Sequence, residues 1–297
     1  MTPVVELIAT RKRYGAIEAL RGVDLRIRPG EVVALLGPNG AGKTTTISLM
    51  LGLRRPTSGT ARLFGLDPTD RRARSRAGVM LQESGVTGML TVRETVRLFR
   101  SYYPRPLPLV EVLALAGLEE VADRRAASLS GGQRQRLYFA LAICGDPEAL
   151  FLDEPTVGMD VEARRTFLAG MRAASSAGKT IVLTTHYLEE ADALAERIVV
   201  IDHGVVIADA SPRDLKARVA SKRVSFTVAV PLGDAVLAGL PVTSVQRSGP
   251  RVRLLSNEPE TVLRALFERG VAVADLEVTG ADLEEAFLAL TRREDDR

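Results

Sequence analysis

Residues 37–44 read Gly-Pro-Asn-Gly-Ala-Gly-Lys-Thr, a pattern that is typical of a phosphate-binding loop. Two glycines five positions apart are followed by a lysine and a threonine, and the apolar residues 31–36 precede them. Glycines let the backbone curl with its N–H groups inward, so that together with the N-terminus of the next helix they form a nest for a β-phosphate. The segment therefore predicts a nucleotide site between a strand and a helix.

The polar residues of this loop have distinct expected roles. Lys43 would place a positive charge beside the β- and γ-phosphate oxygens, and Thr44 a hydroxyl where Mg²⁺ is held between the phosphates. Thr45 can hydrogen-bond the α-phosphate. The alternative, a glycine turn before an ordinary helix, requires coincidence in a chain that is poor in lysine. The predicted nucleotide-binding residues of the loop are Gly37, Pro38, Asn39, Gly40, Ala41, Gly42, Lys43, Thr44 and Thr45.

Two adjacent acids, Asp153 and Glu154, end an apolar run that starts at residue 149. Open α/β sheets bind ligands at the carboxyl ends of their strands, where these acids would lie. Adjacent side chains on a strand point to opposite sides, so one acid can serve the metal and the other the water. We expect Asp153 to hold Mg²⁺ through its water shell and Glu154 to polarise the attacking water. Taken alone, the pair fits equally well a strand end whose acids only cap a loop.

The sequence Leu-Ser-Gly-Gly-Gln at residues 129–133 resembles the diagnostic sequence of ATP-binding-cassette ATPases. It lies between the two nucleotide motifs, as it does in that family. The alternative is a serine N-cap followed by a turn. The resemblance implies that this segment binds the γ-phosphate of ATP held by the opposite protomer, at a helix N-terminus that attracts anions. The residues that would make this contact are Ser130, Gly131, Gly132 and Gln133.

Four further residues match landmarks of the same family in the same order. Tyr14 resembles the aromatic residue that stacks on adenine, and Gln82 the glutamine that touches Mg²⁺ and the attacking water. Asp160 resembles the aspartate of the loop that contacts the opposite protomer, and His186 the histidine that bonds the γ-phosphate and orients Glu154. The alternatives are a tyrosine packed in an edge sheet, an exposed loop amide, a helix N-cap and a structural histidine.

The pattern of apolar residues predicts how these motifs are positioned. Alternating apolar and polar residues at 4–10 and 23–27 indicate an antiparallel edge sheet. Short, mainly apolar strands then alternate with helices, as in a parallel sheet covered by helices. The strands are at 31–36, 78–81, 150–153, 181–184 and 198–201, and the helices at 44–53, 163–175 and 188–195. We therefore expect an α/β phosphate-loop fold with a parallel core sheet over residues 1–220 and a helical insertion at about 84–147. Residues 221–297 would form a small C-terminal α+β domain, with strands at 224–230, 242–246, 252–255 and 271–278 and helices at 259–269 and 281–290.

Composition excludes several classes of function. The chain of 297 residues is 46% hydrophobic and 26% charged, with a net charge of +3, which is too slight to indicate a nucleic-acid partner. Its single cysteine, Cys144, lies in an apolar run, which favours a buried, reduced thiol over a catalytic one. Two histidines and no Cys/His cluster argue against structural zinc. No apolar run approaches the roughly 18 to 20 residues of a membrane-crossing helix, so we expect a cytoplasmic chain.

Because Glu154 and His186 are both present, the resemblance implies a cassette that hydrolyses ATP. By the resemblance, two copies of the chain would sandwich two ATP with Mg²⁺ and drive a separate membrane permease, which would hold them on the inner face of the cell membrane. Residues 184–192 and 282–287 look like the drug- and antibiotic-exporter branch, similar to daunorubicin-exporter ATPase subunits, so the cargo would be a drug, an antibiotic or a lipid. The alternatives are a cassette acting on a nucleic-acid or ribosomal partner, and a regulator that binds ATP without turnover.

Overall fold

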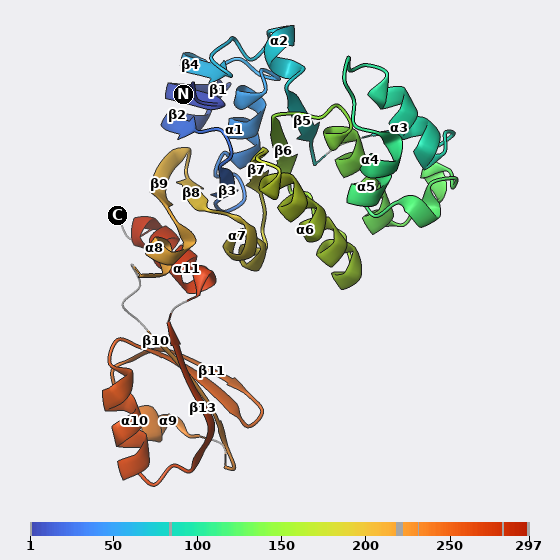
Figure 1. Cartoon of the computed structure of the whole chain (residues 1–297). Helices are drawn as coiled ribbons and strands as arrows, with labels where there is room; N and C mark the ends of the chain where they lie inside the picture. The colour runs from blue at the N-terminus through green and yellow to red at the C-terminus, as the bar shows by residue number, and fades with distance from the viewer. Residues whose placement is uncertain (1, 83–84, 218–221, 231, 281, 296–297) are drawn as a thin grey trace. The chain divides into compact units, whose positions relative to one another are not determined.

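The computed structural model describes residues 2–82, 85–217, 222–230, 232–280 and 282–295 (Figure 1). The chain divides into two compact units, Met1–Ser211 and Pro212–Arg297. The expected domain boundary at 220–221 falls outside the described residues, and helix α8 (Pro212–Ala217) belongs to the second unit. The first unit contains two sheets and the second unit one, and each unit has its own hydrophobic core.

A six-stranded sheet forms the centre of the first unit, and its first five strands run parallel. Three of these strands are buried along their whole length, as expected for a sheet with both faces covered. The last strand, β9, pairs antiparallel with β8 and was not predicted from the sequence. In spatial order the strands are β5 (Ala77–Met80), β6 (Ala149–Asp153), β7 (Thr180–Thr184), β3 (Val32–Leu36), β8 (Arg197–Asp202) and β9 (Val205–Ala210).

The predicted antiparallel edge sheet is confirmed and has three strands, β2 (Ile17–Ile27), β1 (Val5–Tyr14) and β4 (Ser58–Leu63) in spatial order. Strand β4 was missed because its residues are small and polar and show no alternation. Helix α1 (Lys43–Met50) contacts β1, β2 and β4 of this sheet and also β6 of the central sheet. The phosphate-binding loop at the start of α1 is therefore held between the two sheets.

The helical insertion is confirmed between β5 and β6, where Figure 1 shows its helices grouped together. It comprises α3 (Val92–Arg100), α4 (Leu109–Leu115), the short 3₁₀ turns η1 (Glu119–Val121) and η2 (Ala126–Ser128), and α5 (Gly131–Ile143). Helices α2 (Arg71–Arg74), α6 (Val161–Ser176) and α7 (Leu188–Leu194) complete the first unit. Among the helices of the described ranges, none has the length and apolar character needed to span a bilayer.

The second unit contains a four-stranded antiparallel sheet in the order β11 (Val242–Ser248), β12 (Arg251–Ser256), β10 (Lys222–Val228) and β13 (Val273–Gly280). Helix α10 (Pro259–Glu268) packs on β10 and β12, and the short α9 (Asp234–Leu237) lies between β10 and β11 in sequence. Phe226, Leu254 and Leu266 form part of its core. Helix α11 (Leu283–Asp295) contacts α8, and residue 281, where the sequence predicted this helix to start, is outside the described residues.

Candidate functional site

A cavity of about 270 Å³ lies where the loops after β3, β5, β6 and β7 meet, at the carboxyl edge of the central sheet. Open α/β folds bind ligands at this edge. The structure thus brings together nine of the nineteen residues that the sequence assigned to nucleotide binding and hydrolysis. The predicted residues that line the cavity are Asn39, Gly40, Gly42, Lys43, Thr44, Thr45, Gln82, Glu154 and His186.

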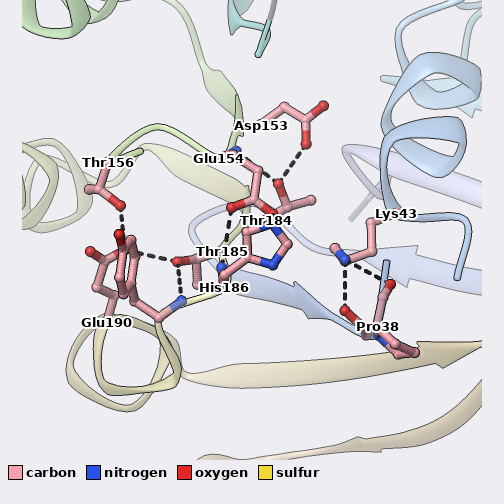
Figure 2. Close-up of polar contacts among 11 residues, drawn as sticks. Pro38, Lys43, Asp153, Glu154, Thr156, Thr184, Thr185, His186 and Glu190 are labelled. Carbon is pink, nitrogen blue, oxygen red and sulfur yellow. Dashed lines mark hydrogen bonds and ion pairs between the residues drawn. The ribbon is translucent and has the colours of Figure 1, made fainter. Parts of the chain in front are cut away.

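Lys43 lies at the first position of α1, directly after the glycine loop. Its ammonium group donates hydrogen bonds to the carbonyl oxygens of Gly37 at 2.7 Å and Pro38 at 3.1 Å (Figure 2). Burial lowers the pKa of Lys43, and the carboxylates of Glu154 and Asp153 act in the opposite direction. Glu154 and Asp153 thus favour the charged form of Lys43, although its hydrogen-bond partners in this structure are the backbone carbonyls of the loop.

Gly42 immediately precedes this helix and has a φ of +109°, a conformation that other residues rarely adopt. A Cβ atom at this position would come within 2.7 Å of the Ala19 carbonyl oxygen and of a methyl group of Leu20. The backbone conformation and the clash of a Cβ atom therefore both require glycine at this position. The requirement agrees with the motif, which places a glycine directly before the lysine.

Asp153 ends strand β6 and is buried. Its Oδ1 accepts a hydrogen bond of 2.6 Å from the hydroxyl of Thr184, at the end of the neighbouring strand β7. Its Oδ2 is also buried and has no hydrogen-bond partner among the described residues. A buried carboxylate oxygen without a partner is costly unless a ligand or an ordered water completes it. Asp153 therefore fits its expected role, in which its carboxylate holds Mg²⁺ through the water molecules bound to the metal.

Glu154 follows β6 and has a φ of +52°, an uncommon conformation for a residue with a side chain. Strand alternation therefore does not set its direction, contrary to the expectation from the sequence, because the strand ends one residue earlier. Its backbone N–H donates to the Thr184 hydroxyl at 2.9 Å. Such strain persists only where surrounding contacts fix it, and it is often found at functional sites.

His186 holds the Glu154 carboxylate from the loop after β7. The backbone N–H of His186 donates to Glu154 Oε2 at 3.2 Å, and its Nε2 lies 3.1 Å from Oε1 (Figure 2). Glu154 is only 5% exposed, and this burial raises the pKa of its carboxyl group, while His186 and Lys43 oppose the shift. A carboxyl group with a raised pKa beside a phosphate-binding loop is suited to act as a general base toward water.

The structure does not place the other predicted residues in this cavity. Tyr14 is 42% exposed at the end of β1, with the Lys12 ammonium 5.0 Å from its ring. Ser130 caps α5, where its hydroxyl accepts from the Gln133 N–H at 3.2 Å, and Asp160 caps α6. These caps are the alternatives that the sequence left open. Ser130 and Asp160 are nevertheless exposed. The assignment of Tyr14, Ser130, Gly131, Gly132, Gln133 and Asp160 to ATP remains a prediction, as does that of the residues that line the cavity.

Sequence reasoning missed three residues around the site. Ala19 lines the cavity from β2, and nothing in its sequence context indicates this. Thr184 joins Asp153 to Glu154, and its position at the end of a buried strand was the available signal. Glu190 is buried in α7 and contacts two loops of the site, and its only sequence signal is its place in the branch-specific segment 184–192.

Comparisons with known proteins agree with this geometry. The family model described as "ABC transporter" matches residues 20–157. The chain is 38% identical to the Nod factor export ATP-binding protein I of Cupriavidus metallidurans, over 99% of both chains. It is 36% identical to the protein of the same name from Ralstonia nicotianae, over 99% of this chain and 95% of the relative. It is also 38% identical to the daunorubicin resistance ATP-binding protein DrrA2 of Streptomyces coeruleorubidus, over 95% of this chain and 93% of the relative.

Solved structures with the same fold are cassettes. A dimeric ATP-binding cassette in a post-hydrolysis state with ADP and Pi aligns with a TM-score of 0.64 and 28% identity, covering 70% of this chain and 98% of that one. An ATP-binding subunit of an ABC transporter aligns with a TM-score of 0.65 and 28% identity, covering 72% and 92%. The predicted α/β phosphate-loop fold is thereby confirmed.

Proposed function

The chain belongs to the ATP-binding-cassette transporter family, and from this premise we propose that it hydrolyses ATP with Mg²⁺ to drive export through a separate membrane permease. It is an ATP-binding subunit of the exporter type. The observation that carries the hydrolysis is the placement of Glu154 and His186 in one cavity with the phosphate-binding loop. A cassette that only binds ATP would not need a carboxylate held in this way.

We assign the following roles to residues in and beside the cavity. Lys43 leaves the Gly37 and Pro38 carbonyls to contact the β- and γ-phosphates, and the loop N–H groups bind the β-phosphate. Thr44, Gln82 and Asp153 would hold Mg²⁺, which neutralises charge that develops on the phosphates. Glu154 takes a proton from the attacking water, and His186 orients Glu154 and contacts the γ-phosphate.

The active unit is a dimer of two copies of this chain. Ser130 and Gly131 are exposed at the N-terminus of α5, where backbone N–H groups point outward and attract anions. Their family role is to bind the γ-phosphate on the other copy, together with the loop that ends at Asp160. A related cassette has been solved as a dimer with ADP and Pi. ATP then bridges the copies, and its cleavage lets them separate.

Export is the direction favoured by the relatives, whose names refer to Nod factor export and daunorubicin resistance. We expect the cargo to be a drug, an antibiotic or a lipid, selected by the permease. The chain would lie in the cytoplasm against the inner face of the cell membrane, held there by that subunit. No nucleic acid takes part in this function.

Size-exclusion chromatography of the Glu154→Gln protein tests the dimer. With ATP and Mg²⁺ the variant should elute as a dimer, and with ADP as a monomer, because the substitution keeps nucleotide binding and removes the base. Glu148→Gln is the matched control, since Glu148 precedes the same strand and pairs with Arg76 on the surface. A Glu154→Gln protein that stays monomeric in ATP contradicts the proposed dimer.

A second test concerns transport. Co-expressed with its membrane permease and reconstituted in vesicles, the chain should support ATP-dependent movement of cargo to the side opposite the ATPase. Movement toward the ATPase side would contradict export, and copurification with ribosomes or nucleic acid instead of a membrane protein would contradict the transporter role.

A further inference from the structure

Glu190 is a buried carboxylate that lies outside the nucleotide cavity. It belongs to α7 and is only 4% exposed. Burial raises the pKa of its carboxyl group, because removing a carboxylate from water disfavours the charged form. Such a group is retained only where several contacts compensate for its lost hydration. Its contacts therefore indicate what it does.

Both main contacts of Glu190 come from loops of the hydrolytic site. Its Oε2 accepts a hydrogen bond of 2.9 Å from the hydroxyl of Thr156 and another of 2.9 Å from the hydroxyl of Thr185 (Figure 2). Thr156 follows β6, and Thr185 follows β7. One carboxylate oxygen thus joins two loops that are otherwise distant in the sequence.

A third element reaches the same carboxylate. Arg164 of α6 has its Nε 3.3 Å from Glu190 Oε1, although Oε1 has no hydrogen bond among the described residues. The guanidinium of Arg164 lies over the ring of Tyr187, 3.8 Å from its centroid. The Thr185 hydroxyl also accepts from the Tyr187 N–H at 2.9 Å. Glu190 is therefore in contact with the start of α6 and with both loops.

These loops carry the residues on which hydrolysis depends. Thr156 lies two positions after Glu154 and precedes the exposed turn that ends at Asp160. Thr185 directly precedes His186. If the hydroxyl of Thr156 or of Thr185 moves, the position or the charge distribution of the shared Glu190 carboxylate changes. That change in turn alters the hydrogen bond of the other hydroxyl. Hydrogen bonds that share one partner are coupled in this way.

We propose that Glu190 is a positioning residue that couples the His186 loop to the loop from Glu154 to Asp160, so that both reach their hydrolysing arrangement together. Glu190 touches none of the reacting atoms, and its effect is exerted through Thr156 and Thr185. The inference rests on the proposed function, because it concerns the turnover of ATP. It also links the face that would meet the second copy to the group that would meet the γ-phosphate.

Double-mutant cycles on turnover test this inference. Thr156→Val, Thr185→Val and the double variant remove the hydroxyls, whereas Thr156→Ser and Thr185→Ser keep them. Thr10→Val is the matched control, because Thr10 is a fully buried threonine with a hydroxyl hydrogen bond to Thr60 in the edge sheet. For each protein, kcat and the ATP dissociation constant are measured, and the melting temperature reports the fold.

The inference predicts that each valine variant lowers kcat about tenfold, less than the roughly hundredfold that a 1 Å misplacement can cost. The ATP dissociation constant should change less than twofold, because it depends on the Lys43 loop. The double variant should lose little more than the worse single variant, because the first substitution already frees the shared carboxylate. The serine variants and Thr10→Val should keep kcat within about twofold of wild type.

Two results would overturn the inference while leaving the proposed function intact: wild-type kcat in both folded valine variants, or losses that multiply in the double variant. Should a valine variant fail to fold, Glu190→Met gives the same test, because its side chain has a similar length but no oxygen to accept from the hydroxyls of Thr156 and Thr185. A wild-type kcat in folded Glu190→Met would then contradict the coupling. A wild-type chain without turnover in the presence of its permease contradicts the proposed function, and this inference with it.

Discussion

His186 contacts both carboxylate oxygens of Glu154, one through its backbone N–H at 3.2 Å and the other through its imidazole Nε2 at 3.1 Å. The two residues are 32 positions apart and come from the loops after adjacent parallel strands. The backbone contact does not depend on the identity of the side chain at 186. The orientation of Glu154 can therefore be separated experimentally from the chemistry of the imidazole.

We predict that His186→Ala lowers kcat for ATP by about 10²-fold to 10³-fold, the range typical of a lost hydrogen-bond donor to developing charge, because its imidazole orients Glu154 and contacts the γ-phosphate. ATP affinity should be nearly unchanged, because the loop around Lys43 remains and the backbone N–H still holds Glu154. Steady-state turnover and equilibrium nucleotide binding measure the two effects.

The matched control is His203→Ala. His203 also lies beside a carboxylate, with its Nδ1 3.0 Å from Asp202 Oδ1, but it does not line the cavity. Its substitution should leave kcat at the wild-type value. Equal losses in the two histidine variants would contradict the role assigned to His186.

Lys43→Met should weaken ATP binding about tenfold to a hundredfold, the amount expected when a charged hydrogen bond of roughly 1.5–3 kcal/mol is lost. Lys179→Met is a close control, because residues 178–180 repeat the triplet Gly-Lys-Thr, yet Lys179 precedes strand β7 and pairs with Asp146. Isothermal titration with ATP and Mg²⁺ compares the two. Similar affinities in both variants would show that the loop at 37–44 is not the nucleotide site.

Cys144 should be unreactive in the folded protein. Its side chain is fully buried, and burial raises the pKa of the thiol to about 11. Only the thiolate reacts with disulfide reagents, so a raised pKa lowers the reactive fraction at neutral pH. Treatment at pH 8 should leave the native chain unmodified, and one equivalent should react after denaturation. Rapid labelling of the native chain would contradict the buried, reduced thiol predicted from the sequence.

Local chemistry explains what the sequence predicted correctly. The phosphate-binding loop is recognisable because its glycines and Lys43 act through backbone conformation and charge within eight residues. Asp153 was placed at a strand end because residues 149–152 are apolar and buried. These features depend on neighbouring residues in the chain and not on distant partners.

Features that depend on distant contacts were not predictable. Strand β4 exists because it pairs with β1, and its own residues carry no strand pattern. Glu190 meets Thr156 across 34 positions, a contact that no local pattern encodes. The cap formed by Ser130 is visible in a single chain, whereas a contact with the nucleotide of a second copy would exist only in the dimer.

Steady-state ATP turnover by the wild-type chain, Glu154→Gln and the control Glu148→Gln is the decisive test of hydrolysis at Glu154. We predict turnover in the wild type and in Glu148→Gln, and a loss of about 10²-fold or more in Glu154→Gln with ATP binding retained. Equal turnover in wild type and Glu154→Gln would contradict the assignment of this chain as an ATPase subunit. ATP binding without any turnover in the wild type, with its permease present, would also contradict it.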